Sequence, residues 1–559
     1  MAEATPFRIA LTSAGAVSGG PYSAGVIDFI MEALDAWYTA KARGEAVPTH
    51  DVRIDAVSGT SAGAVAAGLF PAAVVRSRRA ADGRTPSLLW DVWVNSLDLL
   101  YDDGTSRGFL GLSDMQDPGD AIPSLLNSHR LDAIADAAFG SPWDVGFRPP
   151  PWLSDTLRII LCVTNLPGVP YHIAMQGSGP GEGHDMVQHG DYGMFQFSAA
   201  APSEQGVTHV DPHSTAGWNT LINWALASSA FPVGLAPRVL YASKDVYETR
   251  AWPGRDENGC CRPVHVPTQL PTGTTLRYPA VDGGMVNNEP FELARRALAG
   301  GVCSHLPRDG DEARAAVILV DPFPSPFDSA AYQKLCGLRG DVLDMALPLL
   351  AAMKQQCRFK PEELALAASE DVYSRFLVAP SGGGAGNRTY GDDALAAAGL
   401  GAFAGFLSHA FRTHDYQLGR RNAQQFLRRH FALPLDNPLF APDAGRYAPD
   451  NPLAGYSIAP DADERPGTPV HAPIIPLVGQ LGDPVPAPTW PTLPAAQLPT
   501  MGKAMEPRLN TIVTRLGRKT CWPARLLASA VWPLVRPTVR RKIVEYMERD
   551  LRARGQVTP

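Results

Sequence analysis

The feature that most constrains the fold is a Gly-Thr-Ser-Ala-Gly pentapeptide in which Gly59 and Gly63 flank Ser61. An apolar, strand-like run at 52–57 precedes it, and small, helix-compatible residues follow at 62–69. A serine between two glycines can occupy a sharp strand-to-helix turn, because the glycines spare closely apposed backbones a Cβ collision. The pattern therefore predicts a strand, a tight elbow and a helix, with the Ser61 hydroxyl presented at the elbow.

Short apolar runs alternate with helical patterns over the first 320 residues. Strand-like runs occupy 7–12, 52–57, 159–164, 276–281 and 316–320, and helical patterns occupy 22–38, 62–69, 218–229 and 290–299. This alternation is typical of α/β proteins with a largely parallel sheet that is covered on both faces. Ligands of such sheets bind beyond the carboxyl ends of the strands.

The length of 559 residues fits either several domains or one large domain with insertions. We expect one main domain over 1–433, with an insertion at about 70–215 and a helical extension from about 330. Recurrent prolines at 434–500 predict an extended connector. The last segment, 501–559, has a helical composition, although its prolines should interrupt any helix.

The predicted insertion is rich in aromatic side chains. They include Trp90, Trp93, Trp143, Trp152, Tyr192, Phe195 and Phe197. Such side chains either roof a hydrophobic pocket or form a small satellite core beneath long loops, and the sequence favours neither alternative.

Charge is distributed unevenly along the chain. The formal net charge of -7 argues against nucleic-acid binding, which usually requires a basic surface. From Lys503 onward, however, the chain contains thirteen Lys or Arg residues and only four Asp or Glu residues. This basic tail interleaves apolar residues with cations, so it either contacts an anionic membrane surface or packs on the main domain with a solvated basic face.

Seven cysteines at irregular spacing predict reduced thiols and hence a cytoplasmic protein, with the basic tail as a route to peripheral membrane contact. The sequence starts without a basic and then apolar leader, and it has no uninterrupted apolar run of about 18 residues. Cys260, Cys261 and His265 lie close in sequence, but adjacent cysteines rarely point at one ion. We therefore expect no metal site.

A second polar signal, Asp282-Gly283-Gly284, follows the strand-like run at 276–281. A serine hydroxyl that attacks an acyl carbon needs a base, and a desolvated carboxylate can serve. Asp282 is the preferred base, because its two glycines let the loop fold closely over Ser61; the alternative is a simple turn. Asp321 also ends an apolar run, but a Pro-Phe-Pro sequence stiffens its loop.

The first strand-like run leads into a loop with three glycines before the helix at 22–38. Backbone N–H groups of Gly15, Ala16 and Val17 could stabilise a developing oxyanion there. The alternative is that the glycines serve only as turn residues. A phosphate-binding loop is excluded, because no Gly-Lys-Ser/Thr follows.

Four blocks in this order resemble the patatin-like phospholipase family. They are the glycine-containing loop, the elbow at Ser61, the Ala-Ser-Ser-Ala-Phe-Pro segment at 227–232 and the Asp282 block with its Asn-Asn-Glu-Pro at 287–290. A threonine-led turn at 164–168 is also similar, and the resemblance extends from about 7 to 320. It implies a three-layer α/β/α fold with long insertions and, in this chain, a helical C-terminal extension.

The resemblance also implies the chemistry. The family hydrolyses acyl esters of lipids with a Ser-Asp dyad and without histidine, so Ser61 would be the nucleophile and Asp282 its base. Gly59 and Gly63 would form the elbow around the nucleophile, and Gly283 and Gly284 would form the loop at the aspartate. The oxyanion would be stabilised by Gly15, Ala16 and Val17. The implied activity is that of a phospholipase A or lysophospholipase on a lipid ester, with neither a metal nor an organic cofactor.

One departure concerns the first loop. Many members have Gly-Gly-Gly-x-Arg/Lys-Gly there, whereas this chain has Ala16 and Val17 at glycine positions and Gly19 at the basic position. The missing cation removes the basis for predicting a phosphate headgroup preference. Main-chain N–H groups of Ala or Val can still stabilise an oxyanion.

Two other functions remain open at this point. An α/β-hydrolase with a Ser-His-Asp triad would need His305 or His414, and a catalytically silent lipid-binding protein would keep the fold without turnover. A polar helical segment at 411–422 contains Arg412, His414 and Asp415, which either form a buried hydrogen-bonded network or line the pocket.

Overall fold

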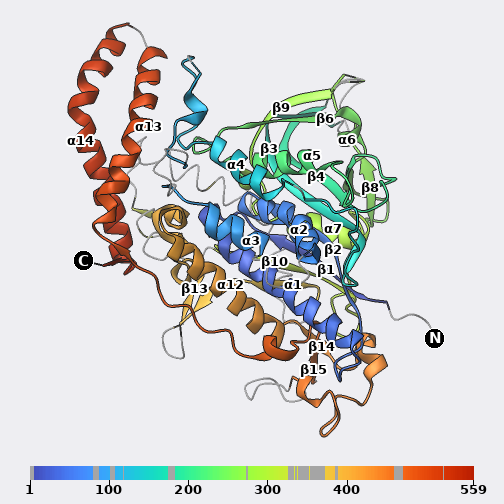
Figure 1. Cartoon of the computed structure of the whole chain (residues 1–559). Coiled ribbons are helices and arrows are strands. Elements are labelled where there is room, and N and C mark those ends of the chain that lie inside the picture. Colours follow the sequence, from blue (N-terminus) through green and yellow to red (C-terminus); the bar gives the residue numbers. More distant parts are fainter. Residues whose placement is uncertain are drawn as a thin grey trace.

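The computed structural model describes residues 5–558 apart from 80–86, 101–107, 118, 141, 174–182, 272, 274, most of 325–371, 384–387, 459–469 and 520–521. The start of the predicted helical extension at about 330 therefore lies outside the described residues. Figure 1 shows a mixed sheet surrounded by helices, with a helical hairpin beside it.

Nine strands of the described chain form the central sheet, in the order β11-β10-β1-β2-β3-β4-β5, with β9 joined to β3 and β6 joined to β9. Their bounds are β1 Phe7–Ser13, β2 Val52–Thr60, β3 Leu153–Ile173, β4 His184–Phe197, β5 Val207–Val210, β6 Arg238–Ser243, β9 Thr275–Asp282, β10 Ala315–Val320 and β11 Arg375–Val378. The pairs from β11 to β3 are parallel, whereas β4 and β9 pair with β3 in the antiparallel sense. The predicted, largely parallel sheet is confirmed.

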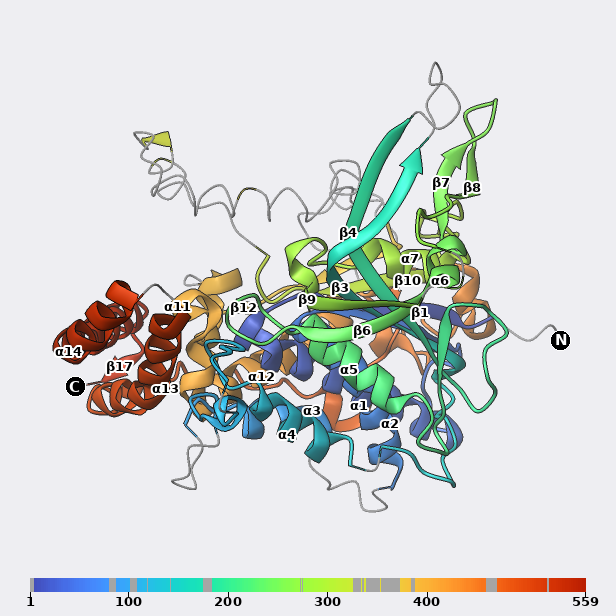
Figure 2. The same ribbon diagram turned by 90° about the horizontal axis from the view of Figure 1, so that it is seen from above.

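Helices cover both faces of this sheet, as Figure 2 shows from above. The helices α1 Gly20–Ala42, α2 Ala62–Arg79, α5 Trp218–Ser228 and α12 His409–Arg429 lie on one side, and α7 Phe291–Ala299 lies on the other. Alternation along β1 explains the two layers. Ile9 and Leu11 belong to the large core beneath α1 and α2, whereas Ala10 packs in the smaller core with Phe291 and Leu298 of α7. The fold is thus the three-layer α/β/α arrangement of the prediction.

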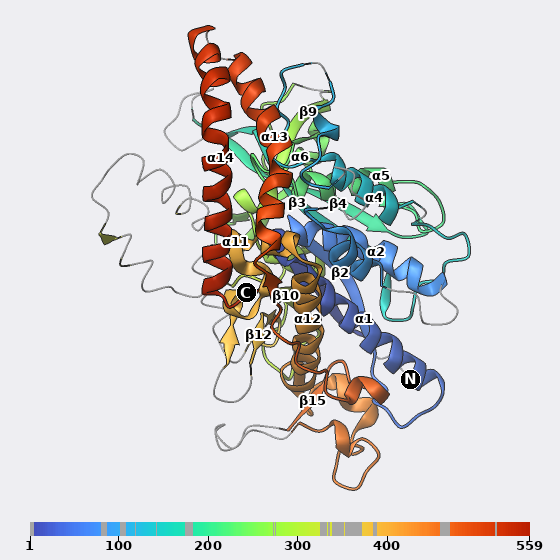
Figure 3. The ribbon, with the colours of Figure 1, turned by 60° about the vertical axis from the view of Figure 1, so that its left-hand side comes forward.

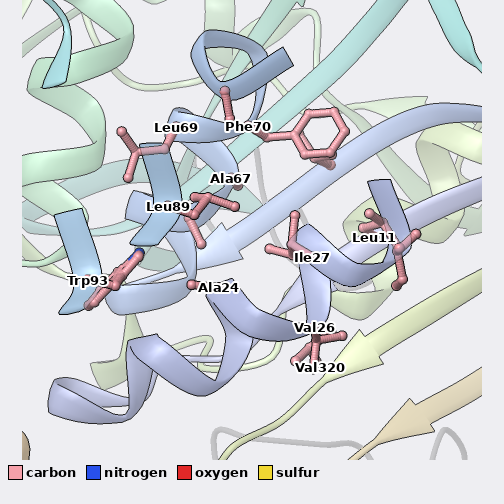
Figure 4. Packing of buried hydrophobic residues seen from close by; sticks show 14 of the residues in the cluster. Leu11, Ala24, Val26, Ile27, Ala67, Leu69, Phe70, Leu89, Trp93 and Val320 are labelled. Carbon is pink, nitrogen blue, oxygen red and sulfur yellow. The ribbon is translucent and has the colours of Figure 1, made fainter. Parts of the chain in front are cut away.

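The larger core is densely packed around α1 and α2 (Figure 4). Ile27, Leu69 and Trp93 are among its buried side chains, and each is less than 5% exposed. Helix α12 approaches α1 so closely that a Cβ on Gly25 would meet the carbonyl oxygen of Tyr416 at 2.1 Å. Glycine at this crossing therefore sets the distance between the two helices.

The predicted insertion consists of elements that belong to different parts of the body. It contains α3 Leu88–Trp90 and α4 His129–Ala138, and it continues through β3, β4 and β5. Trp152, Phe195 and Phe197 join the main core, whereas Trp93 also lines the cavity described below. Trp93 thus lines a pocket, as one of the two alternatives predicted, whereas the other three belong to the main core and not to a small satellite core.

Smaller elements connect these parts. They are α6 Lys244–Glu248, β7 Ala251–Arg255, β8 Cys261–His265, β12 Ser381–Gly382, β13 Thr389–Tyr390, α11 Gly399–Ala402, β14 Ala432–Pro434, β15 His471–Pro473, β16 Leu493–Pro494 and β17 Val557–Thr558. Within the proline-rich segment, the Asn437 side chain donates hydrogen bonds to the carbonyl groups of Gly310 and Ala313.

The C-terminal residues form a helical hairpin of α13 Gln497–Lys519 and α14 Trp522–Ala553, which stands beside the body (Figures 1 and 3). The expectation that prolines interrupt this region is wrong for Pro533 and Pro537, because α14 continues through both of them. Pro507 lies inside α13 in the same way. Packing against α13 and the body holds these helices despite the missing N–H donors.

A disulfide joins Cys261 to Cys303, whose Cα atoms are 5.4 Å apart. The prediction of reduced thiols is therefore wrong for these two residues, and it fails because the fold brings together cysteines that are 42 residues apart in sequence. Cys162 is a buried free thiol and Cys260 an exposed one. The cysteines thus no longer support a cytoplasmic location. Among the described helices, none is both long and apolar enough to span a bilayer.

Candidate active site

Ser61 lies at a strained turn between β2 and α2. Its backbone has a φ of +55°, a left-handed conformation that is uncommon for residues other than glycine. A Cβ on Gly59 would meet the carbonyl oxygen of Gly63 at 2.1 Å, and one on Gly63 would meet that of Ser13 at 2.1 Å. Both glycines are therefore required for the chain to turn here, as the pentapeptide predicts.

The Ser61 hydroxyl donates a hydrogen bond of 2.6 Å to Oδ2 of Asp282. The other carboxylate oxygen, Oδ1, accepts the N–H of Gly284 at 2.7 Å. The backbone of Asp282 is fixed as well, because its carbonyl accepts the Thr164 hydroxyl and its N–H donates to the carbonyl of Ala230. One oxygen of the carboxylate is thus held by the loop while the other faces the serine.

Ser228, at the end of α5, connects the elbow to β3 through two hydrogen bonds. Its hydroxyl accepts the N–H of Ser61 at 2.8 Å and donates to the carbonyl of Cys162 on β3. A Cβ on Gly283 would meet that same carbonyl oxygen at 2.4 Å. The sequence placed Ser228 in a block that resembles the family but assigned it no role. That resemblance was the one signal that could have pointed to it.

The loop after β1 lies directly against Ser61. A Cβ on Gly15 would approach the Cβ of Ser61 to 3.2 Å and Oδ1 of Asn288 to 2.4 Å. However, the Gly15 N–H donates to the carbonyl of Asn288 at 3.1 Å, so this predicted oxyanion donor is occupied in the structure. Val17 has a φ of +45° and lines the cavity at Ser61. Of the three predicted donors, Ala16 and Val17 remain as candidates.

Ser18 ties this loop to a distant segment, a contact that sequence reasoning missed. Its hydroxyl donates to the carbonyl of Ala402 and accepts the N–H of Gly405. Leu400 and Ala402 have positive φ values of 57° and 72°, so the contacting segment is itself strained. No local pattern could have shown this pairing, because the partners are 384 residues apart.

An apolar cavity of about 960 Å³, including its open mouth, begins at Ser61 and Asp282. Asp282 is the one titratable side chain among the described residues that line it. The other lining side chains come from α2, α4, α5 and the segments beside them, and they include Val65, Leu69, Leu97, Ile134, Phe139, Leu226, Phe231, Phe403 and Phe406. A space with such walls fits hydrocarbon better than a polar ligand.

The rival residues lie elsewhere. His414 contacts Oδ1 of Asp415 through Nδ1 at 2.8 Å, and the Asp415 carboxylate accepts the N–H groups of Ala396 and Ala397. His305 is exposed in a loop. Neither histidine lines the cavity at Ser61. Asp321 is also outside it, and its Oδ1 accepts the N–H of Phe323.

Arg412, the third residue of the polar helical segment, is fully buried away from the cavity. Its guanidinium donates to the carbonyl groups of Val94 and Gly405 and contacts Oδ2 of Asp98. The segment thus forms the buried network that was one of the two alternatives.

Cys162 is the nucleophilic side chain nearest to the elbow in the sheet, where it pairs with Thr60. Burial raises the pKa of its thiol to about 12, so the thiol stays protonated and unreactive at neutral pH. Among the described residues, no cluster of three or more His, Cys, Asp or Glu could hold a metal ion. Cys261 is tied in the disulfide and is not part of a metal site with Cys260 and His265.

Comparison with known proteins gives three findings. The profile of the family described as patatin-like phospholipase matches residues 11–295. Uncharacterized protein y4iI of Sinorhizobium fredii is 32% identical over 592 residues, which cover 98% of this chain and 81% of that protein. The structure of VipD from Legionella pneumophila is 11% identical, with a TM-score of 0.16. The match covers 60% of this chain and 52% of that chain, and we draw no conclusion from it.

Proposed function

Because the chain belongs to the patatin-like phospholipase family, we propose that it is a serine hydrolase that cleaves carboxylic ester bonds of phospholipids, lysophospholipids or neutral lipids. The hydrogen bond of 2.6 Å between Ser61 Oγ and Asp282 Oδ2 is the observation that carries the proposal. Both residues line an apolar cavity that can accept an acyl chain. The nucleophile, the base and the substrate site are thus adjacent.

Catalysis would proceed in two steps. Oγ of Ser61 attacks the ester carbonyl while Asp282 accepts its proton, and the resulting tetrahedral intermediate then expels the alcohol, which takes up that proton. In the second step Asp282 accepts a proton from water, the water oxygen attacks the acyl-Ser61 ester, and Ser61 recovers its proton as the fatty acid leaves. The first step leaves Asp282 ionised and Ser61 acylated, and the second step restores the free hydroxyl of Ser61. The chain itself thus supplies the nucleophile and the base.

The negative charge of the tetrahedral intermediate needs donors, and two features support their position. The amides of Ala16 and Val17 belong to the loop that lies against Ser61, and α2 begins at Ala62, so its positive end faces the same place. We assign the oxyanion role to Ala16 and Val17, with Gly15 holding the loop through Asn288.

The basic C-terminal tail supports a second part of the proposal, peripheral contact with an anionic lipid surface. On α14, Leu534 is 78% exposed and Val531 and Val535 are each 39% exposed, next to a cluster of cations at 540–542. Exposed apolar side chains flanked by Arg and Lys are typical of helices that rest on anionic membranes. Sedimentation with vesicles of phosphatidylcholine alone or with phosphatidylserine tests this. Binding should be stronger to the anionic vesicles, and Leu534→Ser should weaken it.

The decisive test of the activity is Ser61→Ala. Incubation of a mixed lipid extract with the wild-type protein should release fatty acids that mass spectrometry detects, and the variant should lose this turnover by at least about 10⁴-fold. A fluorophosphonate should label the wild type at Ser61. His305→Asn and His414→Asn serve as controls for a histidine-dependent triad, because both should keep turnover in a dyad enzyme. Fatty-acid release by a clean Ser61→Ala preparation would rule out the assignment, and an unlabelled, inactive wild type would point to a lipid-binding protein.

A further inference from the structure

A second apolar cavity lies between the body and the C-terminal hairpin. Its volume is about 950 Å³, including its open mouth. Side chains of the body, among them Leu99 and Leu110, form one wall, and Leu509, Ile512 and Ile543 of α13 and α14 are in the other. The hairpin, which Figure 3 shows beside the body, therefore also contributes one wall of a hydrophobic cavity.

The two cavities have three residues in common. Leu126, Phe403 and Phe406 line both, and they form the wall between the space at Ser61 and the space beneath the hairpin. The rings of Phe403 and Phe406 contact each other with centroids 5.9 Å apart. The two cavities are thus neighbours that share lining side chains.

This shared wall lies at the catalytic end of the first cavity. Phe403 packs on Phe231, with ring centroids 6.0 Å apart, and Phe231 follows Ala230, whose carbonyl accepts the N–H of Asp282. On the other side, Gly405 donates to Ser18, the neighbour of Val17. Two hydrocarbon chains that diverge from one point near Ser61 could therefore enter the two cavities on either side of the wall.

We propose that the second cavity binds the second acyl chain of a diacyl glycerolipid while the chain to be released occupies the cavity at Ser61. The inference rests on the proposed function. It predicts that diacyl substrates, in which two chains leave adjacent carbons of one glycerol, use both cavities. A lysolipid would use the first cavity and leave the second without an acyl chain.

The walls of the second cavity favour a hydrocarbon chain over a headgroup. Arg508 is the charged side chain among its described lining residues, and it is already paired. Its guanidinium contacts both carboxylate oxygens of Asp114 at 2.8 Å and donates to the carbonyl of Leu125 at 2.6 Å. A phosphate group would find no free cation there, whereas a methylene chain needs none.

The geometry also argues against a single long chain that runs through both cavities. Leu69 lies eight residues along α2 from Ser61, about 12 Å at the rise of a helix, and it lines the first cavity but not the second. A chain that extends from Ser61 along α2 therefore moves along residues that the second cavity does not share. The two spaces meet near the reacting ester, as a pair of chains requires.

Ile512→Trp tests the proposal, with Leu516→Trp as its control. Ile512 is 6% exposed and lines the second cavity alone, whereas Leu516, one turn later on α13, is 51% exposed and lines neither cavity. Turnover is measured on dioleoyl-phosphatidylcholine and on 1-oleoyl-lysophosphatidylcholine in the same micelles. Ile512→Trp should lower the ratio of diacyl to monoacyl kcat/KM by about tenfold or more, because the indole fills the second cavity. Leu516→Trp should leave the ratio unchanged.

Three outcomes would overturn the proposal. The first is an unchanged ratio of diacyl to monoacyl kcat/KM in Ile512→Trp. The second is loss of turnover on both substrates in a variant that is folded and labelled by the fluorophosphonate. The third is a loss of turnover that depends on chain length across a series of lysolipids, which would place the distal end of a single chain in the second cavity. Leu509→Trp, at another position on the same wall, replaces Ile512→Trp if that variant does not fold. Failure of the proposed function would look different, because the wild type would then show neither turnover nor labelling of Ser61.

Discussion

Two regions of the molecule are held in place in different ways. One is the end of the sheet at which Ser61 and Asp282 meet, called the catalytic edge after its proposed role, and the other is the C-terminal hairpin. At the catalytic edge, backbones touch where glycines allow it, as between Gly63 and the carbonyl of Ser13. In the hairpin, Arg508 and Arg515 of α13 reach residues of the body that lie almost 400 positions earlier in the sequence. The first region depends on short contiguous motifs, and the second depends on polar pairs that no motif records.

Under the proposed function, this difference separates catalysis from substrate selection. The proposed dyad and the proposed oxyanion loop lie on elements of the sheet and of α2, where a displacement of a side chain by 1 Å would impair the proposed chemistry. The hairpin supplies one wall of a neighbouring cavity, and its contacts can change without moving Ser61. A change at the glycines should therefore abolish turnover, whereas a change in the hairpin should alter which lipid is accepted.

Gly63→Ala should have the largest effect. The new Cβ would lie 2.1 Å from the carbonyl oxygen of Ser13, and neither backbone can move without displacing β1 or α2. We expect the free energy of unfolding to fall by about 3 kcal/mol or more and turnover to be lost. Urea denaturation and ester hydrolysis measure the two effects.

The matched control is Gly455→Ala. Gly455 is exposed, and a Cβ there would have no neighbour within 4 Å. This variant should keep wild-type stability and turnover. Full activity in Gly63→Ala would show that the catalytic edge tolerates more displacement than the contact between Gly63 and Ser13 implies.

The sequence predicted the catalytic edge well because its determinants are local. Each of the five strand-like runs lies within a strand of the sheet, and the elbow forms at Ser61 as the flanking glycines require. The meeting of Ser61 with Asp282 also followed from the sequence, since both residues come at the ends of strands in one sheet. The catalytic roles of these residues remain proposals that the variants above test.

What the sequence did not reveal depends on contacts between distant segments. The disulfide joins cysteines 42 residues apart, and the hydroxyl of Ser18 binds a carbonyl 384 residues away. The second cavity is lined by Leu125 and Leu126 together with residues of α13 and α14, a combination that a periodicity in either segment cannot show. Pro533 and Pro537 were expected to end a helix by local rules, and tertiary packing overrides those rules.

Arg508→Met should have the next largest effect, and it should act on the hairpin. Arg508 and Asp114 are both nearly fully buried, so removing the cation leaves a buried carboxylate without its partner. We expect α13 to lose about 3–5 kcal/mol of its docking free energy, which hydrogen exchange of the α13 amides measures. Labelling of Ser61 by a small fluorophosphonate should persist, because the catalytic edge does not depend on this pair.

Arg518→Met provides the comparison on the same helix. Arg518 also contacts an aspartate, Asp120, at 3.2 Å, but the two side chains are 46% and 44% exposed. Its loss should change α13 protection by less than about 1 kcal/mol, since exposed ion pairs contribute little. Equal effects of the two variants would contradict the view that the buried pair anchors the hairpin.

The smallest expected effect is on the pH dependence of stability. It concerns two buried titratable side chains, Asp28 and His50, which like the hairpin contact residues far away in the sequence. Burial raises the pKa of Asp28 to about 6, although its carboxylate accepts the hydroxyls of Ser87 and Tyr416. Burial lowers the pKa of His50 to about 4, although its ring contacts the carbonyl of Ile474. The two shifts have opposite consequences for the pH dependence of stability.

For Asp28, the folded protein binds more protons than the unfolded chain between about pH 4 and 6, so its contribution to stability falls as the pH rises through that window. For His50, the folded protein binds fewer protons between about pH 4 and 6.5, so its contribution to stability rises with pH there.

Each of these two pKa shifts corresponds to about 3 kcal/mol, and in the wild type the two contributions largely cancel. Asp28→Asn should remove the first of them. The variant should therefore lose about 2 kcal/mol more stability than the wild type when the pH falls from 6.5 to 4, because this window does not span both pKa values of Asp28 completely. Urea denaturation at both pH values measures this difference, and parallel pH profiles of the two proteins would show that Asp28 is ionised in the folded state throughout the window.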